Sequence, residues 1–267
     1  MDDHIKHTTD FLRALKSNGK HAFTLDALIN AVPKSVKNIR KDLDRLREKG
    51  EIINIRKGFY TLLPIEYQSM GAIPVEFYID DLMGYLSKNY YVGLFSAAMF
   101  HGAAHQQPQE YFVITEAPKP RKIKHVHFNI NFSEKKHFSI YDIESKKTET
   151  GYFNMSGPAL TFLDLIYFEK IIGGYNRIIT VLQELMEVMS MGKMREAVKN
   201  SFPDSTFQRA GYIADYHLNH KKLAYIFERK LAKSKPRTIL LKSSGAPEGI
   251  VDDKWKVMVN VEIDSDL

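Results

Sequence analysis

Residues 35–49 read SVKNIRKDLDRLREK, with apolar side chains three, four and three positions apart. This spacing predicts an amphipathic helix that Gly50 ends. Its buried stripe would consist of Val36, Ile39, Leu43 and Leu46. The same geometry turns polar side chains toward solvent on the other side, namely Lys34, Lys37, Asn38, Lys41 and Arg45. Such a face is commonly no more than a solvated surface, so its meaning depends on the neighbouring segments.

Two shorter helices are expected before this one. Residues 4–16 carry apolar side chains at helical spacing, and the segment 17–19 (Ser-Asn-Gly) ends the first helix. A second helix is expected to begin after Thr24, a good N-cap, and it cannot continue through Pro33. A short helix, a tight turn and a longer basic helix follow one another in a helix-turn-helix, whose second helix enters the major groove of DNA.

A β-hairpin is expected directly after the third helix. Residues 52–55 and 59–62 are two β-rich runs around a turn that carries two cations and Gly58. Three helices and a hairpin with a basic tip make a winged helix-turn-helix, which we place at residues 1–65. We therefore expect it to bind double-stranded DNA through Lys34, Ser35, Lys37, Asn38, Lys41 and Arg45 of the third helix and Arg56 and Lys57 of the wing.

The distribution of charge favours the same interpretation. The 267-residue chain has a net charge of +6, and residues 1–60 alone hold thirteen Lys/Arg against eight Asp/Glu. A localised basic surface attracts phosphate backbones at long range. The simpler alternative is that these cations only keep the helix and the turn soluble.

The remaining composition is that of a globular protein with two domains. Hydrophobic residues make up 44% of the chain, and no apolar run is long enough for a membrane span. The N-terminus lacks a secretory h-region. Cysteine is absent, which excludes disulfides and thiolate metal sites and fits a cytoplasmic protein.

After a linker at residues 66–74, a larger mixed α/β domain is expected at residues 75–267. The pattern predicts strands at 110–115, 126–132, 137–143, 238–242 and 255–261, and helices at 76–88, 94–100, 157–168, 175–189, 191–200, 206–219 and 222–232. The fold class is therefore α+β, with a helical C-terminal half.

Several motifs resemble those of one family. The wing reads Arg-x-Gly-x-Tyr at 56–60, and residues 90–102 read YYVGLFSAAMFHG. Residues 159–165 (ALTFLDL) and 255–261 (WKVMVNV) extend the likeness over essentially the whole chain. The sequence resembles the AbiEi family, the antitoxins of type IV toxin–antitoxin systems.

The resemblance implies a function for each domain. The winged helix would repress the promoter of its own operon, often at inverted repeats, which requires two protomers or cooperative binding on DNA. The C-terminal domain would oppose a nucleotidyltransferase toxin, and a stable complex between the two proteins would not be required.

The residues give no positive reason to expect an enzyme. His101 and His105 have the spacing of two metal ligands, but Gly102 interrupts the helix and no third ligand is nearby. The set Asp252, Asp253 and Lys254, with Asp204 as a partner, is a short match to nuclease sites. We expect no catalytic residues, metal or cofactor. The alternatives left open are a regulator whose second domain senses a ligand, a nuclease targeted to DNA, and a non-specific DNA anchor.

Overall fold

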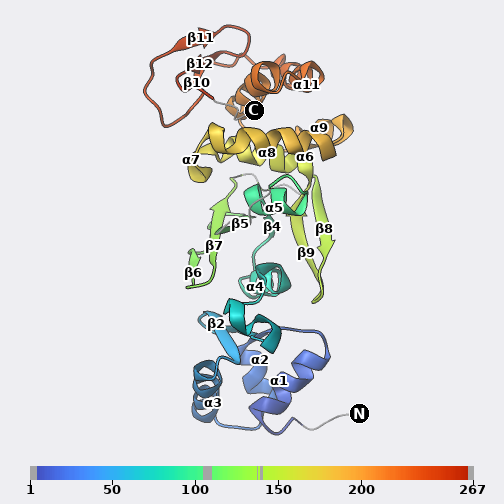
Figure 1. Ribbon diagram of the computed structural model, residues 1–267, viewed down its shortest axis with the longest axis vertical. Coiled ribbons are helices and arrows are strands. Elements are labelled where there is room, and N and C mark those ends of the chain that lie inside the picture. Colours follow the sequence, from blue (N-terminus) through green and yellow to red (C-terminus); the bar gives the residue numbers. More distant parts are fainter. Residues whose placement is uncertain (1–4, 105–109, 137, 139–140, 264–267) are drawn as a thin grey trace. The chain divides into compact units, whose positions relative to one another are not determined.

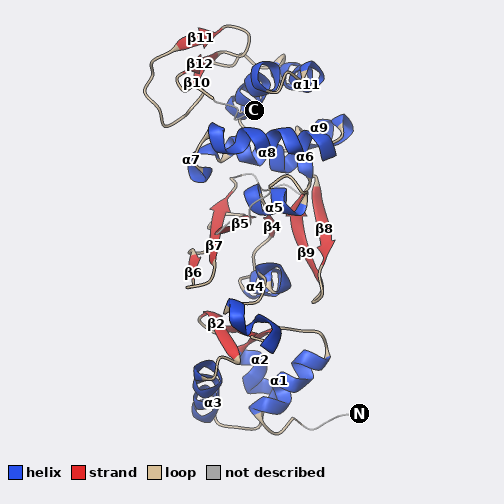
Figure 2. Ribbon diagram, in the orientation of Figure 1, coloured by secondary structure: helices blue, strands red, loops and turns tan. Residues whose placement is uncertain are grey.

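The computed structural model describes residues 5–104, 110–136, 138 and 141–263. The chain divides into two compact units. The first comprises Met1–Tyr91, Gln109–Glu134 and Ser145–Asn154, and the second comprises Val92–Pro108, Lys135–Glu144 and Met155–Leu267. Helices and sheets both occur, so the predicted α+β class is confirmed (Figure 2).

The first unit begins with the predicted order of three helices and a hairpin (Figure 1). A short strand before α2 was not predicted, and it joins the hairpin in an antiparallel sheet of order β1-β3-β2. The elements are α1 (Thr8–Ser17), β1 (Ala22–Thr24), α2 (Leu25–Ala31), α3 (Val36–Glu48), β2 (Ile52–Arg56) and β3 (Phe59–Leu62).

Local capping explains where these helices begin. The backbone N–H of His7 donates to the Asp10 carboxylate at 2.9 Å, so α1 begins four residues later than expected. The Thr24 side chain accepts from the N–H of Ala27 at the start of α2, as an N-cap does. Ser35 caps α3 in the same way, by accepting from the N–H of Asn38.

One apolar core joins the three helices to the hairpin. Its buried members are Leu12, Phe23, Leu28, Val32, Ile39, Leu43, Leu46, Ile52 and Leu62. The prediction that Val36 belongs to this core is wrong, because the side chain is 41% exposed. Val36 is the first residue of α3, and the buried residues of the helix begin one turn later, at Ile39.

The rest of the first unit contains short helices, which include α4 (Ile79–Tyr85), and most of a six-stranded sheet of order β6-β7-β5-β4-β9-β8. Strand β5 pairs in parallel with β7, and β6 pairs antiparallel with β7. The remaining elements are η1 (Ile65–Met70), η2 (Val75–Phe77), β4 (Tyr90–Val92), β5 (Glu110–Thr115), β6 (Ile123–Lys124), β7 (Asn129–Glu134), β8 (Ile143–Lys147) and β9 (Tyr152–Ser156).

Three expected elements differ from the structure in this region. The segment expected as a linker contains a 3-10 helix over Ile65–Met70, and Ile73 is buried. The helix expected at 76–88 is interrupted, because a 3-10 turn precedes α4. Of the strand expected at 137–143, residues 137, 139 and 140 lie outside the described part, residues 138, 141 and 142 are not in a strand, and β8 begins at Ile143.

The second unit is built around α6 (Pro158–Tyr167). Every residue from Ala159 to Ile166 is buried, as expected for a helix that is apolar on all sides. It contacts α5, α8, α9 and α10. The helices are α5 (Leu94–Phe100), α6, α7 (Glu169–Ile172), α8 (Tyr175–Val188), α9 (Met191–Ala197), α10 (Asp204–Tyr212), η3 (Ile213–His217) and α11 (Lys221–Leu231).

A small sheet at the C-terminal end packs on α10. Its order is β10-β12-β11, from β10 (Ile239–Leu240), β11 (Ile250–Asp252) and β12 (Val257–Val259). The sequence predicted β10 and β12 but not β11. The single helix expected at 206–219 is also corrected, because α10 begins at Asp204 and η3, which continues it, is a π-helix.

Candidate nucleic-acid interface

The outer face of α3 carries the predicted cations. Ile39, Leu43 and Leu46 point into the core, and this orients Lys37, Lys41 and Arg45 toward solvent, where all three are exposed. Ser35 uses its hydroxyl as the N-cap, whereas the side chain of Asn38 remains exposed. The helix therefore presents two lysines, an arginine and an amide on its surface.

Asp42 holds two of the predicted contact residues. Its carboxylate accepts from Lys34 Nζ at 2.8 Å and lies 3.9 Å from Arg45 Nη1. It also accepts from the hydroxyl of Thr8, which is buried at the start of α1. The hydrogen bond from Lys34 lowers the pKa of Asp42, so this carboxylate remains charged at neutral pH. Lys34 and Arg45 are thus partly neutralised, which Lys37 and Lys41 are not.

A small cavity of about 250 Å³ adjoins this network. It is lined by His7 and Thr9 at the start of α1, by Lys49 after α3, and by Asp42 and its partners. Backbone N–H groups at a helix start and nearby cations are the groups that proteins use to contact phosphates. The cavity therefore places His7, Thr9 and Lys49 next to Asp42, Lys34 and Arg45.

The tip of the hairpin is fixed by backbone contacts. Gly58 has a φ of +79°, and a Cβ there would lie 2.8 Å from the hydroxyl of Tyr85. That hydroxyl donates to the carbonyl of Lys57 at 3.1 Å. The side chain of Lys57 is exposed, whereas Arg56 is half-buried and donates to the carbonyl of Arg121 at 3.4 Å. Lys57 is therefore the more accessible of the two predicted wing cations.

Two exposed arginines were missing from the sequence-based prediction. Arg40 lies on α3 three residues after Lys37, so the helical spacing that selected Lys37 could have found it. Arg121 adjoins Arg56 through the hydrogen bond above, but the turn Pro118–Lys122 in which it lies is far away in sequence. Only the folded chain shows that it belongs beside the hairpin.

The motif that made the family resemblance most specific has a packing role. Ser96, Ala97 and Ala98 on α5 are completely buried, and α5 packs against α6. The Nε2 atom of His101 lies 2.8 Å from the carbonyl oxygen of Ser156. His101 thus has a structural partner within the second unit, while His105, which has the spacing of a second metal ligand in the sequence, lies outside the described residues.

The residues of the nuclease alternative also have structural partners. Asp252 accepts from the backbone N–H of Trp255 at 2.7 Å and from the hydroxyl of Tyr216 at 2.9 Å. Lys254 donates to the buried carboxylate of Asp215 at 2.7 Å. Asp253 points into solvent and pairs with Lys256. Asp204 lines a different part of the second unit, a cavity to which neither Asp252 nor Asp253 contributes.

Within the described ranges, no three His, Asp or Glu side chains lie close enough to hold a metal ion. No helix among the described residues has the length and apolar character needed to span a membrane.

Comparisons with known proteins identify a similar fold for the whole chain and a similar family for its middle segment. No curated protein matches the sequence. Among solved structures, the Rv2827c protein from Mycobacterium tuberculosis has the same fold, with a TM-score of 0.65 and 12% identity over 96% of this chain and 92% of that one. Residues 91–216 match the family model described as the AbiEi antitoxin C-terminal domain. The predicted resemblance is therefore confirmed over this segment, which is similar to the C-terminal domain of AbiEi antitoxins.

Proposed function

We propose that residues 1–65 are a winged helix that binds double-stranded DNA, with α3 in the major groove and the hairpin tip against phosphates. The observation that carries this proposal is the outer face of α3, where Lys37 and Lys41 are exposed and form no ion pair with a described residue. The opposite face of the helix is packed on α1 and α2 and cannot turn outward. A rigid helix that presents cations in this way is the element that reads DNA in helix-turn-helix proteins.

The side chains on this face suggest a division of roles. Lys37, Lys41 and Lys57 suit phosphate contacts, because an ammonium group is a flexible point charge. Asn38 suits a bidentate contact with adenine, and Arg45 one with guanine. Lys34 would need to leave Asp42 before it could contact a phosphate fully.

We propose that the chain acts in the cytoplasm as an autorepressor and as the antitoxin of a type IV toxin–antitoxin system. The AbiEi domain at residues 91–216 supports the antitoxin role. The partner would be a nucleotidyltransferase toxin, opposed without a stable complex. Repression at inverted repeats would place two protomers on the promoter, either as a dimer or by cooperative binding.

The DNA-binding role is tested with the full chain and the double variant Lys37→Ala/Lys41→Ala. The unaltered protein should prefer the duplex upstream of its own gene over a scrambled duplex by about 10³-fold, with an affinity that falls as salt rises. The variant should lose this binding and retain its melting temperature, because both side chains are exposed.

A charge-matched control is available in the second unit. Lys170→Ala/Lys222→Ala removes two exposed lysines from other helices and should leave the affinity for DNA unchanged. Equal loss in both double variants would show that only net charge matters and would contradict the assignment of α3. Weak and equal binding to both duplexes would contradict autorepression.

The antitoxin role has a separate readout. In cells whose growth is arrested by a nucleotidyltransferase toxin of a type IV system, expression of this chain should restore growth, and the Lys37→Ala/Lys41→Ala variant should still do so. Failure of the unaltered chain to rescue growth would contradict the antitoxin proposal while leaving the DNA proposal intact.

A further inference from the structure

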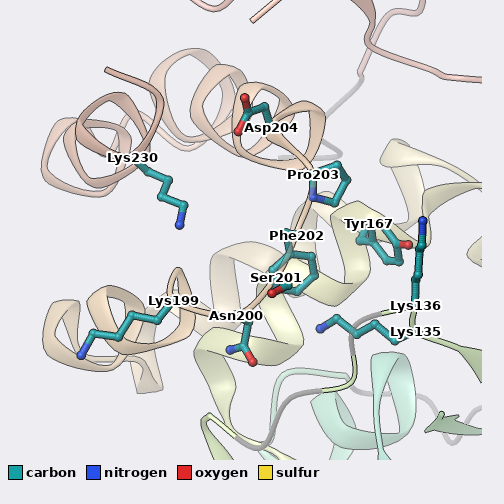
Figure 3. A pocket seen from close by; sticks show the side chains of 10 residues that line it. All are labelled: Lys135, Lys136, Tyr167, Lys199, Asn200, Ser201, Phe202, Pro203, Asp204 and Lys230. Carbon is teal, nitrogen blue, oxygen red and sulfur yellow. The ribbon is translucent and has the colours of Figure 1, made fainter. Parts of the chain in front are cut away.

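The second unit contains a basic cavity that none of the roles above uses. Its volume is about 640 Å³, within the range of roughly 300–1,000 Å³ that small-molecule sites occupy. Four lysines line it, and they come from separate segments: two follow β7, one follows α9 and one lies on α11 (Figure 3). Asp204 is the acidic residue among those lining it.

Lys135 is fixed at the wall of the cavity by an aromatic ring and a buried acid. Its Nζ lies 3.0 Å from Asp164 Oδ1, with both side chains almost fully buried, and 3.7 Å from the centre of the Phe202 ring. Burial lowers the pKa of Lys135, whereas the charge and hydrogen bond of Asp164 raise it. Tyr167 packs edge-on against Phe202, with ring centres 5.7 Å apart. The wall is therefore rigid and partly aromatic.

Two of the four lysines are exposed and lie outside any ion pair with the described residues. These are Lys136 and Lys230, whereas Lys199 is paired with Glu196 at 2.9 Å. Figure 3 shows the amine of Lys230 reaching into the opening. An anion bound there would therefore be attracted most by Lys136 and Lys230, because no described carboxylate pairs with either amine.

Asn200, which lines the cavity, has a buried side-chain oxygen without a hydrogen-bond donor among the described residues. Asn200 is 2% exposed, and its Nδ2 donates to the carbonyls of Ala197 and Tyr141. Its Oδ1 is buried and accepts no hydrogen bond from the described residues. Buried acceptors in folded proteins almost always have a donor, so this oxygen has room for one from an ordered water or from a ligand.

We propose that this cavity binds a small phosphate-bearing ligand of nucleotide size. Lys136 and Lys230 would contact the phosphate oxygens, with Lys199 available to a longer phosphate chain. The Oδ1 of Asn200 would accept from a hydroxyl or amino group of the ligand body, and Tyr167 would offer its ring to a flat base. The site shares no residue with the proposed DNA contacts of α3.

Calorimetric titration of the full chain tests the proposal. The probes are the four ribonucleoside triphosphates, the matching nucleosides without phosphate, and inorganic pyrophosphate. Triphosphates should bind saturably and raise the melting temperature, and nucleosides should bind at least about tenfold more weakly, since each charge-assisted hydrogen bond contributes about that factor. A preference among the four triphosphates, which differ only in the base, would show that the wall also contacts the base, and equal binding of all four and of pyrophosphate would show that the phosphates suffice.

Two variants connect the binding to these residues. Lys136→Ala/Lys230→Ala should weaken triphosphate binding by about tenfold or more, as should the single change Lys230→Glu if the double variant folds poorly. Lys37→Ala/Lys41→Ala removes the same charge elsewhere and should bind triphosphates as the unaltered chain does.

Three results would overturn the proposal. The first is unchanged binding in both cavity variants. The second is equal weakening in the Lys37→Ala/Lys41→Ala control, which would indicate attraction by net charge alone. The third is binding of single-stranded RNA without binding of any mononucleotide, which would make the cavity part of a nucleic-acid surface.

Discussion

Replacement of Asp215 by asparagine should weaken the attachment of the C-terminal sheet to the helices and lower the stability of the protein. Asp215 lies in η3, is only 3% exposed, and accepts hydrogen bonds from two lysines and an indole. These come from Lys221 Nζ at 2.5 Å, Lys254 Nζ at 2.7 Å and Trp255 Nε1 at 3.1 Å. The last two donors belong to the segment between β11 and β12, so this carboxylate links the sheet to the helices, together with hydrogen bonds from Gln208 and Arg209 of α10 to backbone carbonyls of the sheet region.

The pKa of this carboxylate sets the size of the effect. Burial acts to raise the pKa of Asp215, but the hydrogen bonds from Lys221, Lys254 and Trp255 outweigh it and bring the pKa from 3.8 to about 2. A depressed pKa stabilises the folded form above the unfolded value, by about 2 kcal/mol for this shift. This stabilisation is present at neutral pH and is lost as the pH falls from about 4 to 2. The asparagine variant should therefore be less stable at pH 7 by about 2–3 kcal/mol.

The chain contains its own probe for this measurement. Trp255 is the single tryptophan, it is buried, and it donates to Asp215. Urea unfolding followed by tryptophan fluorescence therefore reports on the segment that the carboxylate holds. Asp253→Asn is the matched control, because Asp253 is 91% exposed and pairs only with Lys256, so its loss should change the free energy of unfolding by less than about 0.5 kcal/mol.

Measurement at two pH values makes the test strict. The difference between the unaltered chain and Asp215→Asn should shrink by about 2 kcal/mol between pH 7 and pH 2, because the carboxylate loses its charge over that interval. A difference that stays constant with pH would show that Asp215 is not charged in the folded protein. A loss at pH 7 no larger than that of Asp253→Asn would refute the idea that this residue attaches the sheet.

Two further changes test other contacts, the first through the stability of the protein and the second through its affinity for DNA. Gly211→Ala should destabilise the second unit by about 1–3 kcal/mol in urea unfolding, because the added methyl would overlap the ring of Trp255. This loss is expected even though alanine favours helices over glycine. An unchanged or stabilised protein would contradict this packing. Asp42→Asn should strengthen DNA binding, because Lys34 and Arg45 lose their carboxylate partner. The plot of log affinity against log salt should steepen by about 1 for each cation that gains a phosphate, and an unchanged slope would show that neither does.

The helices could be predicted where local signals and burial agree. The bounds of α3 were expected to within about one residue, because Ser35 caps its start, Gly50 follows its end and its apolar residues repeat at helical spacing. Strands β8 and β11 were misplaced or missed for a physical reason. Most of β8 is exposed, β11 carries two exposed residues, and both lie at sheet edges, so their structure comes from pairing with a neighbour.

The candidate sites show a second limit of sequence reasoning. The charge of Lys34 can be read from the sequence, but its neutralisation by Asp42 depends on the turn between α2 and α3. The cavity of Lys135, Lys199 and Lys230 joins three distant segments and leaves no local pattern. Periodicity indicates which face of a helix is exposed, whereas only tertiary contacts show which charges on that face remain available.

The part of the chain that identifies the family and the part proposed to bind DNA are different. Residues 91–216 match the antitoxin domain, and within them the block from Ser96 to His101 is engaged in packing. Lys37 and Lys41 lie outside that match, on a helix whose core residues place no demand on its outer face. The match to the family model therefore supports the proposed antitoxin role without specifying an operator. The outer face of α3 could change from one member to another at little cost in stability, so that related antitoxins would keep one fold while each reads its own promoter.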